Sequence, residues 1–477
     1  MNKKLFPILS AFLLLFSLIE KGQATETYRP ETSVAGFIQL PGSGRQVYNF
    51  NPGWRFFKGD IHGAESVDFD DRSWTIVSTP HTVELMPAEA SGCRNYQGPA
   101  WYRKHFVLPA ETKGKRVLIH FEAAMGKQVL YLNGKRIQEH VGGYLPFTLD
   151  LTTNGIQAGD SCLLAIFVDN SNDKSFPPGK PQYTLDFAYH GGIYRDVWMI
   201  AKSPVSITDP LDSQTVAGGG VFVHFDKISE KSAQVYVNTE LQNDNQHTET
   251  VTVETTLTDA DGKVIKRTSG KLSLKSGEKK IIRQQVEVKS PKLWSPDAPY
   301  LYRVQSCIKK GNQSIDGGIT RIGIRLAEFR GKDGFWLNGK PFGQLVGANR
   351  HQDFAYVGNA LPNSQQWRDA KRLRDAGCTI IRVAHYPQDP SFMDACDELG
   401  MFVIVATPGW QYWNKDVKFG ELVHQNTREM IRRDRNHPSV LMWEPILNET
   451  RYPLDFALKA LEITKEEFPY PGRPVAA

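Results

Sequence analysis

The sequence predicts three successive folded parts: a jelly-roll β-sandwich, an immunoglobulin-like β-sandwich and the first half of a TIM-type (β/α)8 barrel. The first observation is length, because 477 residues exceed what a single core of about 250–300 residues can organise. The second is that short strands separated by turn signals fill the chain up to about residue 326. The third is that strands alternate with helices after Phe335, which is the pattern of a parallel sheet.

The N-terminus, residues 1–24, is typical of a secretory signal peptide. Lys3 and Lys4 precede the apolar stretch Leu5–Ile19, and Ala24 offers a small residue for cleavage. We therefore expect a periplasmic or secreted protein with no membrane span after cleavage. An uncleaved membrane anchor is the alternative interpretation of the same segment.

Residues 25–45 are polar and rich in Thr, Gly and Ser, which predicts a linker. Residues 46–202 predict the jelly-roll sandwich, because apolar strands such as Gln128–Leu132 and Leu163–Asp169 recur without a helical period. Asn133-Gly134 follows the first of these strands and predicts a hairpin, since a type I′ turn needs positive φ at both central positions.

Residues 203–326 predict the second sandwich. Strands such as Val251–Leu257 and Lys279–Val288 alternate with turns such as Asp259–Gly262 over about the length of an immunoglobulin domain.

Residues 327–477 predict the barrel part. A complete barrel needs about 250 residues, so we expect roughly half a barrel here and the rest in a longer product or from elsewhere. The predicted strands are Phe342–Asn349, Thr379–Ala384, Met401–Ala406, Ser439–Trp443 and Arg473–Ala477. The predicted helices are Ser364–Ala376, Pro390–Leu399, Glu421–Arg435 and Leu454–Phe468.

Charge and cysteine content narrow the function. The net charge of +5 is spread along the chain without a long basic run, so nucleic acid is not an expected partner. The five cysteines are scattered and odd in number, which argues against a disulfide framework or a zinc site.

In a barrel, functional side chains follow the strands. The strand ends predicted here carry carboxylates, amides, imidazoles and aromatic rings, which are suited to binding and cleaving sugars. The aromatic residues Trp410, Tyr412 and Trp413 follow the third strand and could stack on a sugar or form core. A nucleophilic serine elbow and a phosphate-binding glycine loop are both missing from these positions.

The chain resembles glycoside hydrolase family 2, the family of β-galactosidases, β-glucuronidases and β-mannosidases. The resemblance runs in order through all three parts. It is carried by WYRK (101–104), YLNG (131–134), GGY (142–144), GIYRDV (192–197), LWSP (293–296), LNGK (337–340), GANRH (347–351), IRVAHYP (381–387), CDELG (396–400), RDRNHPSV (433–440) and NE (448–449).

The resemblance implies site residues. Glu449 matches the general acid/base, and Asn448 matches the residue that binds the sugar 2-hydroxyl. His351, Arg382 and His385 match positions lining the sugar pocket, although Arg382 could equally be structural. Asp186 matches an aspartate that reaches the site from the first sandwich in β-galactosidases, with a turn aspartate as the alternative.

Three departures qualify the resemblance. The family's nucleophilic glutamate lies further downstream, and we expect it beyond the end of this chain. Val405–Trp410 contains no acid where β-galactosidases hold Mg²⁺, so no metal or other cofactor is expected. Four residues rather than three separate Trp443 from Asn448, which makes Glu444 a rival acid.

The sequence therefore predicts a retaining, exo-acting glycosidase that removes a β-linked sugar, with a galactoside favoured, from an oligo- or polysaccharide. The alternative is a truncated, non-catalytic carbohydrate-binding protein or an inactive fragment. The oligomeric state stays open.

Overall fold

The computed structural model describes residues 30–86 and 95–476. The predicted signal peptide lies outside the described residues. Residues Thr32–Ala477 form one unit, which contains all the elements below. No helix in the described ranges is long and apolar enough to cross a membrane.

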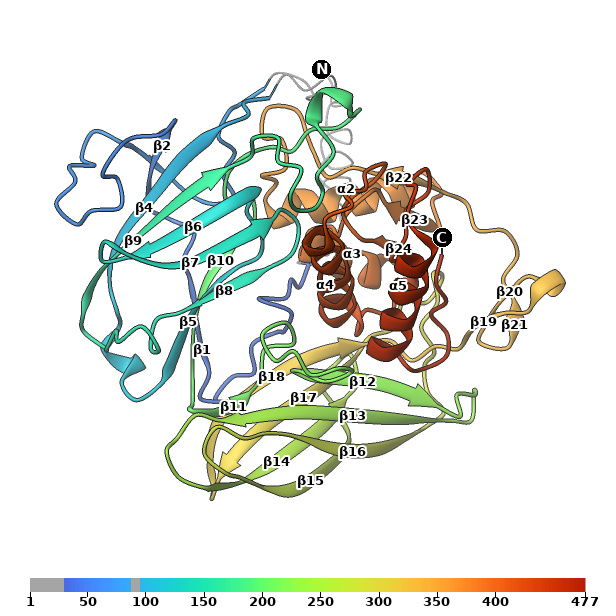
Figure 1. Ribbon diagram of the computed structural model, residues 1–477. Helices are drawn as coiled ribbons and strands as arrows, with labels where there is room; N and C mark the ends of the chain where they lie inside the picture. The colour runs from blue at the N-terminus through green and yellow to red at the C-terminus, as the bar shows by residue number, and fades with distance from the viewer. Residues whose placement is uncertain (1–29, 87–94, 477) are drawn as a thin grey trace, which may run out of the picture. The chain divides into compact units, whose positions relative to one another are not determined.

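The first sandwich consists of two antiparallel sheets (Figure 1). One has the order β1 (Gln46–Asn49), β10 (Val197–Lys202), β5 (Arg116–Phe121) and β8 (Phe147–Asp150). The other has the order β3 (Thr75–Val77), β2 (Trp54–Lys58), β4 (Pro99–Val107), β9 (Ser161–Asp169), β6 (Gly126–Leu132) and β7 (Lys135–Gly142). The predicted hairpin joins β6 to β7, with φ of 49° at Asn133 and 81° at Gly134. The jelly-roll prediction is confirmed.

The second sandwich is also as predicted. Its first sheet joins β13 (Ser232–Asn243) to β11 (Val205–Ile207), β12 (Val221–Asp226) and β16 (Lys279–Lys289). Its second has the order β15 (Val264–Leu274), β14 (Glu249–Thr258), β17 (Tyr302–Lys310) and β18 (Gln313–Ile322).

Part of the predicted linker packs against this second sandwich. Ile38 pairs with Ile319 through two backbone hydrogen bonds, and the Arg45 guanidinium contacts the Asp316 carboxylate at 2.7 Å. Residues 33–45 are thus an ordered strap rather than a free connection. A small sheet of β19 (Ala327–Phe329), β20 (Phe335–Leu337) and β21 (Lys340–Pro341) follows the sandwich.

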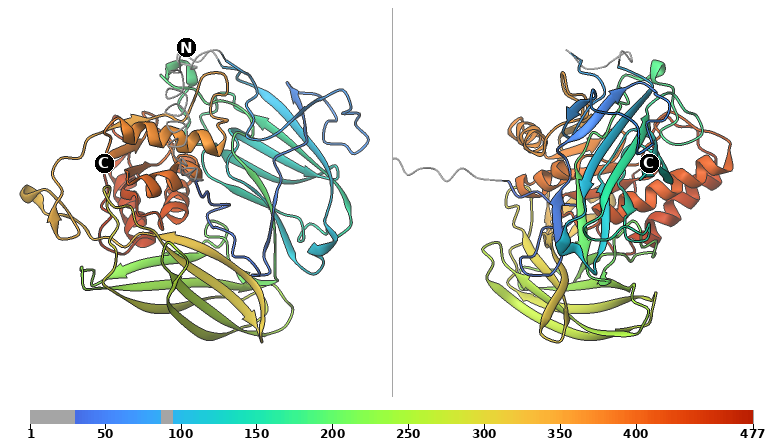
Figure 2. Two further views of the ribbon diagram at one scale, coloured as in Figure 1. Left: turned by 180° about the vertical axis from the view of Figure 1, so that it is seen from behind. Right: turned by 90° about the vertical axis from the view of Figure 1, so that its left-hand side faces the viewer.

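The last part contains four parallel strands in chain order with helices between them (Figures 1 and 2). The strands are β22 (Gly347–Arg350), β23 (Ile380–Val383), β24 (Phe402–Ala406) and β25 (Val440–Glu444). The helices are α2 (Asn363–Asp375), α3 (Pro390–Leu399), α4 (Val417–Asp434) and α5 (Leu454–Glu467). The partial barrel is as predicted, and Val475 forms a parallel bridge with Trp443 where a fifth strand was expected.

In the barrel part, the starts of one strand and one helix differ from the predictions by several residues. Strand β22 begins at Gly347 rather than Phe342, because Phe342 packs with Phe335 and Phe402 below the sheet. Helix α4 begins at Val417 rather than Glu421, because the Asp416 side chain caps it by accepting a hydrogen bond from the Lys418 backbone N–H at 2.9 Å. The cysteines described by the structure, Cys162, Cys307, Cys378 and Cys396, are free thiols.

The first sandwich and the barrel part share a buried aromatic contact. The rings of Tyr144 and Tyr386 stack with centroids 4.0 Å apart. Beside them the fully buried Arg195 donates to the Pro387 carbonyl at 2.9 Å and to the Gln352 side chain at 3.0 Å. These contacts fix the loops of the sandwich over the carboxyl ends of the barrel strands.

Candidate active site at the strand ends

Arg382, on β23, links two residues of the β25 segment. Its guanidinium forms a paired contact with the Glu444 carboxylate, with Nε–Oε2 at 2.8 Å and Nη2–Oε1 at 2.7 Å. Nη2 also donates to Asn448 Oδ1 at 2.7 Å. Glu444 is buried and both of its oxygens accept from Arg382, so its carboxylate serves the scaffold. Arg382 therefore has a structural role at this strand end, and it also holds the side chain of Asn448 in place.

Glu449 lies in the turn after β25 and its side chain is exposed at the barrel mouth. Its backbone is left-handed, with φ of 61°, a conformation that costs energy for a residue with a Cβ and that clusters at functional sites. The Gln411 side-chain amide donates to Glu449 Oε2. Of the two carboxylates at this strand end, Glu449 is therefore the accessible one.

Aromatic and imidazole rings line the neighbouring strand ends. The buried His385 ring stacks on Trp410 with centroids 4.6 Å apart and planes 5° apart. Burial, together with the nearby Arg382 charge, lowers the pKa of His385 to about 3. His351 lies against Phe187 of the first sandwich at 4.5 Å, and its Nδ1 is 3.2 Å from the Tyr386 hydroxyl. A neutral His385 gives this wall hydrogen-bonding capacity without charge.

Asp186 lies in the sandwich loop that reaches the barrel, and its side chain is exposed. Its charge acts on Lys180 of the same loop, as does the charge of Glu449. The structure thus places the predicted residues Glu449, Asn448, His351, His385, Arg382 and Trp410 at neighbouring strand ends, and Asp186 is linked to them through the effect of its charge on Lys180.

The three aromatic residues that follow the third strand, Trp410, Tyr412 and Trp413, have different environments. Trp410 lies beside His385, but Trp413 packs on Phe456 at 4.5 Å and Tyr412 packs on Phe419 at 5.5 Å. Those partners belong to α4 and α5, so Tyr412 and Trp413 are half-buried residues that pack against the α4–α5 cluster. Of the two interpretations of the trio, packing describes Tyr412 and Trp413, whereas Trp410 lies beside the imidazole of His385.

Sequence reasoning missed three residues of this mouth: Lys180, Phe187 and Gln411. The contacts of these residues with the site form between segments that are far apart in the sequence. A glutamine between Trp410 and Tyr412 carries no sequence signal for a left-handed backbone. Phe187 could have been suspected, since it directly follows Asp186.

Two other polar clusters do not form a competing site among the described residues. Asp394, Asp397 and His437 have metal-ligand spacing, but His437 Nδ1 contacts Asp397 at 2.6 Å and Arg321 pairs with Asp394 at 2.8 Å. These protein groups already satisfy the carboxylates, so the cluster is suited to an internal ion-pair network rather than a cation.

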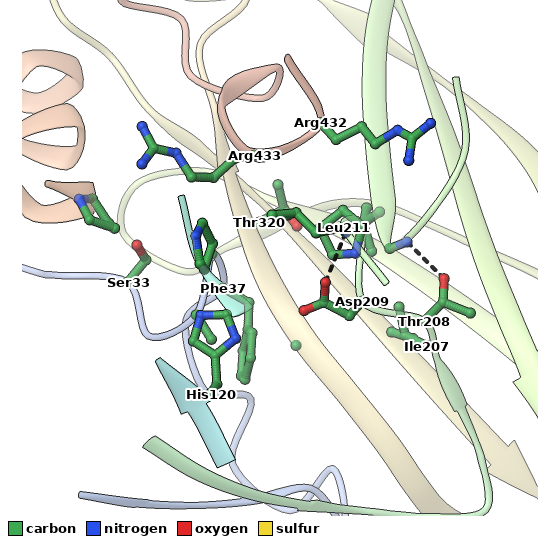
Figure 3. Close-up of a pocket in the computed structure, with 18 of the residues that line it drawn as sticks. Ser33, Phe37, His120, Ile207, Thr208, Asp209, Leu211, Thr320, Arg432 and Arg433 are labelled. Carbon is green, nitrogen blue, oxygen red and sulfur yellow. Dashed lines mark hydrogen bonds between the residues drawn. The ribbon is translucent and has the colours of Figure 1, made fainter. Parts of the chain in front are cut away.

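A cavity lies between residues of the N-terminal strap, both sandwiches and α4 (Figure 3). His120 and Asp209 line one side of it and Arg432 and Arg433 another. Arg432 pairs with Glu467, and Arg433 pairs with its neighbour Asp434. The cavity shares no lining residue with the strand-end group.

Two β-sandwiches followed by parallel βα units, with polar residues gathered at the strand ends, define the class of barrel proteins with appended sandwich domains. Models of one family match the chain in the same order. The sugar-binding domain of glycosyl hydrolases family 2 matches residues 64–204, the central model of that family matches 219–325, and its TIM barrel domain matches 329–475. The chain belongs to glycosyl hydrolases family 2.

Individual relatives agree. A β-galactosidase of Thermoanaerobacter pseudethanolicus is 36% identical over 88% of this chain, and a β-glucuronidase of Formosa agariphila is 32% identical over 85%. The solved structure of a family 2 β-glucuronidase superposes with a TM-score of 0.83 at 30% identity over 92% of this chain. The chain spans about half of these proteins, at 54%, 42% and 47% of their respective lengths.

Proposed function

We propose that the protein containing this chain is a retaining, exo-acting glycosidase that releases a β-linked sugar from oligo- or polysaccharides. The observation that carries the proposal is the different environment of the two glutamates at the end of β25. Arg382 occupies both oxygens of Glu444, whereas Glu449, beside Asn448, is accessible at the barrel mouth. Family membership supports this assignment.

In the proposed mechanism Glu449 protonates the leaving oxygen and then, as a carboxylate, activates the water that completes hydrolysis. A second carboxylate, beyond Ala477, attacks the anomeric carbon. Asn448, held by Arg382, binds the 2-hydroxyl, and Trp410 with His385 forms a flat wall beside the sugar. A relative from Bacteroides uniformis, a β-glucuronidase covalently bound to cyclophellitol-6-carboxylate aziridine, supports a route through a covalent intermediate.

We propose that the sugar is a β-galactoside, because the exposed Asp186 matches the aspartate that reaches the site from the first sandwich in β-galactosidases. The relatives include both β-galactosidases and β-glucuronidases, so matched aryl galactosides and glucuronides are the substrates to compare. We also propose export to the periplasm or medium, from residues 1–24. N-terminal sequencing of the mature protein tests this, and an intact Met1 would contradict it.

The test of Glu449 is leaving-group dependence. In the complete protein, Glu449→Gln is expected to lower kcat/KM about 10²–10⁴-fold on substrates with poor leaving groups. Activated aryl glycosides, whose leaving group needs no proton, should lose much less in the glycosylation step. Equal losses on both substrate types would remove Glu449 from the acid role.

The 477-residue chain should be assayed in parallel. Binding of a β-linked sugar without turnover would favour a non-catalytic carbohydrate-binding role for this chain. Turnover comparable with that of the complete protein would show that the second carboxylate lies within these residues.

A further inference from the structure

We propose that Lys180 and Gln411 are positioning residues that hold Glu449 in its working orientation. This inference rests on the proposed function. Gln411 is the central member, because its amide N–H donates to Glu449 Oε2 while its amide oxygen accepts from the Lys180 ammonium. The two hydrogen bonds use both ends of one amide and fix its orientation.

The backbone around Gln411 supports this role. Gln411 is left-handed and lies opposite the left-handed Glu449. Its backbone N–H donates to Thr450 Oγ1 at 2.9 Å, so the turn after β24 and the turn after β25 are joined twice, through side chain and main chain. Such strained turns persist only where surrounding contacts hold them.

Lys180 lies in a loop of the first sandwich. Its ammonium lies 4.3 Å from the centroid of the Trp410 ring, a cation–π contact, in addition to its hydrogen bond with Gln411. Lys180 therefore touches two consecutive residues of the barrel loop. A flexible lysine with two partners is restrained, and the restraint passes through Gln411 to Glu449.

The loop that carries Lys180 is docked on the barrel. The Lys174 carbonyl accepts from the Asn414 side chain at 2.7 Å. Gly179 has φ of 73°, and a Cβ at this position would lie 2.5 Å from the Tyr412 ring, so only glycine permits this approach. The docking brings Lys180 to the mouth as part of the folded structure.

The charge of Lys180 also acts on the site. The carboxylates of Asp186 and Glu449 both act on its ammonium, and the Lys180 charge in turn acts on His385. The Lys180 ammonium is therefore linked to the Glu449 carboxylate both through its charge and through the hydrogen bonds of Gln411.

The test compares Gln411→Met, Gln411→Asn and Lys180→Met in the complete protein, with Lys174→Met as the charge-matched control in the same loop. Gln411→Asn keeps an amide on a residue type that tolerates left-handed backbone, but it is too short to bridge both partners. We expect kcat for poor leaving groups to fall about tenfold, equivalent to about 1.4 kcal/mol. KM and the melting temperature should stay near wild type.

Lys180→Arg, which keeps a cationic hydrogen-bond donor for Gln411, is expected to restore the kcat that Lys180→Met loses. Wild-type kcat in both Gln411 variants would overturn the proposal. So would a rise in KM confined to β-glucuronides in Lys180→Met, which would assign Lys180 to binding an anionic sugar. Glu449→Gln, measured alongside, distinguishes the failure of this inference from the failure of the proposed function. If Glu449→Gln shows a leaving-group effect and the Gln411 variants show none, only the positioning role is rejected.

Discussion

Arg382→Met is expected to destabilise the protein by about 3 kcal/mol. Breaking a buried ion pair by removing one partner costs about 3–5 kcal/mol, because the remaining charge stays desolvated. The Glu444 side chain is 6% exposed and that of Arg382 is 19% exposed, so some water reaches the pair and we take the lower end of this range. The lost hydrogen bond to Asn448 should also lower activity.

Urea unfolding at pH 7 measures this prediction, with Arg372→Met, an exposed arginine on α2, as the control. The double variant Arg382→Met/Glu444→Gln removes the stranded charge and should recover about half of the loss. A coupling energy below about 0.5 kcal/mol between the two positions would refute the ion-pair account. So would a destabilisation by Arg382→Met no larger than that of the control.

Two further predictions concern buried titratable groups. Burial, with Asp196 and Asp389 nearby, raises the pKa of Glu122 well above its usual value, so this residue's contribution to stability is lost as pH rises above about 4.5. Glu122→Gln, which keeps the acceptor for Trp198 Nε1, should match wild type at pH 4 and be more stable than wild type at pH 8 in urea unfolding. The same difference from wild type at both pH values would contradict this. Because burial lowers the pKa of His385 to about 3, the NMR chemical shifts of its imidazole should stay constant from pH 5 to 8. The His385→Gln variant assigns the signals. A titration midpoint near 6.5 would show that the ring is not desolvated.

Local signals in the sequence predict much of this fold. Helix α3 has the predicted bounds, Pro390–Leu399, because the Asp389 carboxylate caps its start and the left-handed Gly400 ends it, and both act on their own neighbours. Asn133-Gly134 specifies its hairpin for the same reason. The strand-end rule then brings Arg382, Asn448 and Glu449 to one edge of the sheet, since parallel strands align their carboxyl ends.

The remaining features depend on tertiary contacts. Nothing local to Lys180 indicates that its loop docks on the turn after β24, more than 200 residues later in the chain. Trp410, Tyr412 and Trp413 are close in sequence, but the last two pack against the α4–α5 cluster while Trp410 stacks on His385. Glu444 and Glu449 are the same residue type, and the structure distinguishes them by burial and by the contact of Arg382 with both oxygens of Glu444.

The acid/base role of Glu449 is tested most directly by azide rescue in the complete protein. Glu449→Ala leaves the second step without a base, whereas azide attacks the covalent intermediate without one. With a dinitrophenyl β-glycoside, we predict that azide accelerates turnover of Glu449→Ala but not of wild type, and that the product is the β-glycosyl azide, as double displacement requires. An unchanged rate with azide, or an α-glycosyl azide, would contradict the assignment of Glu449.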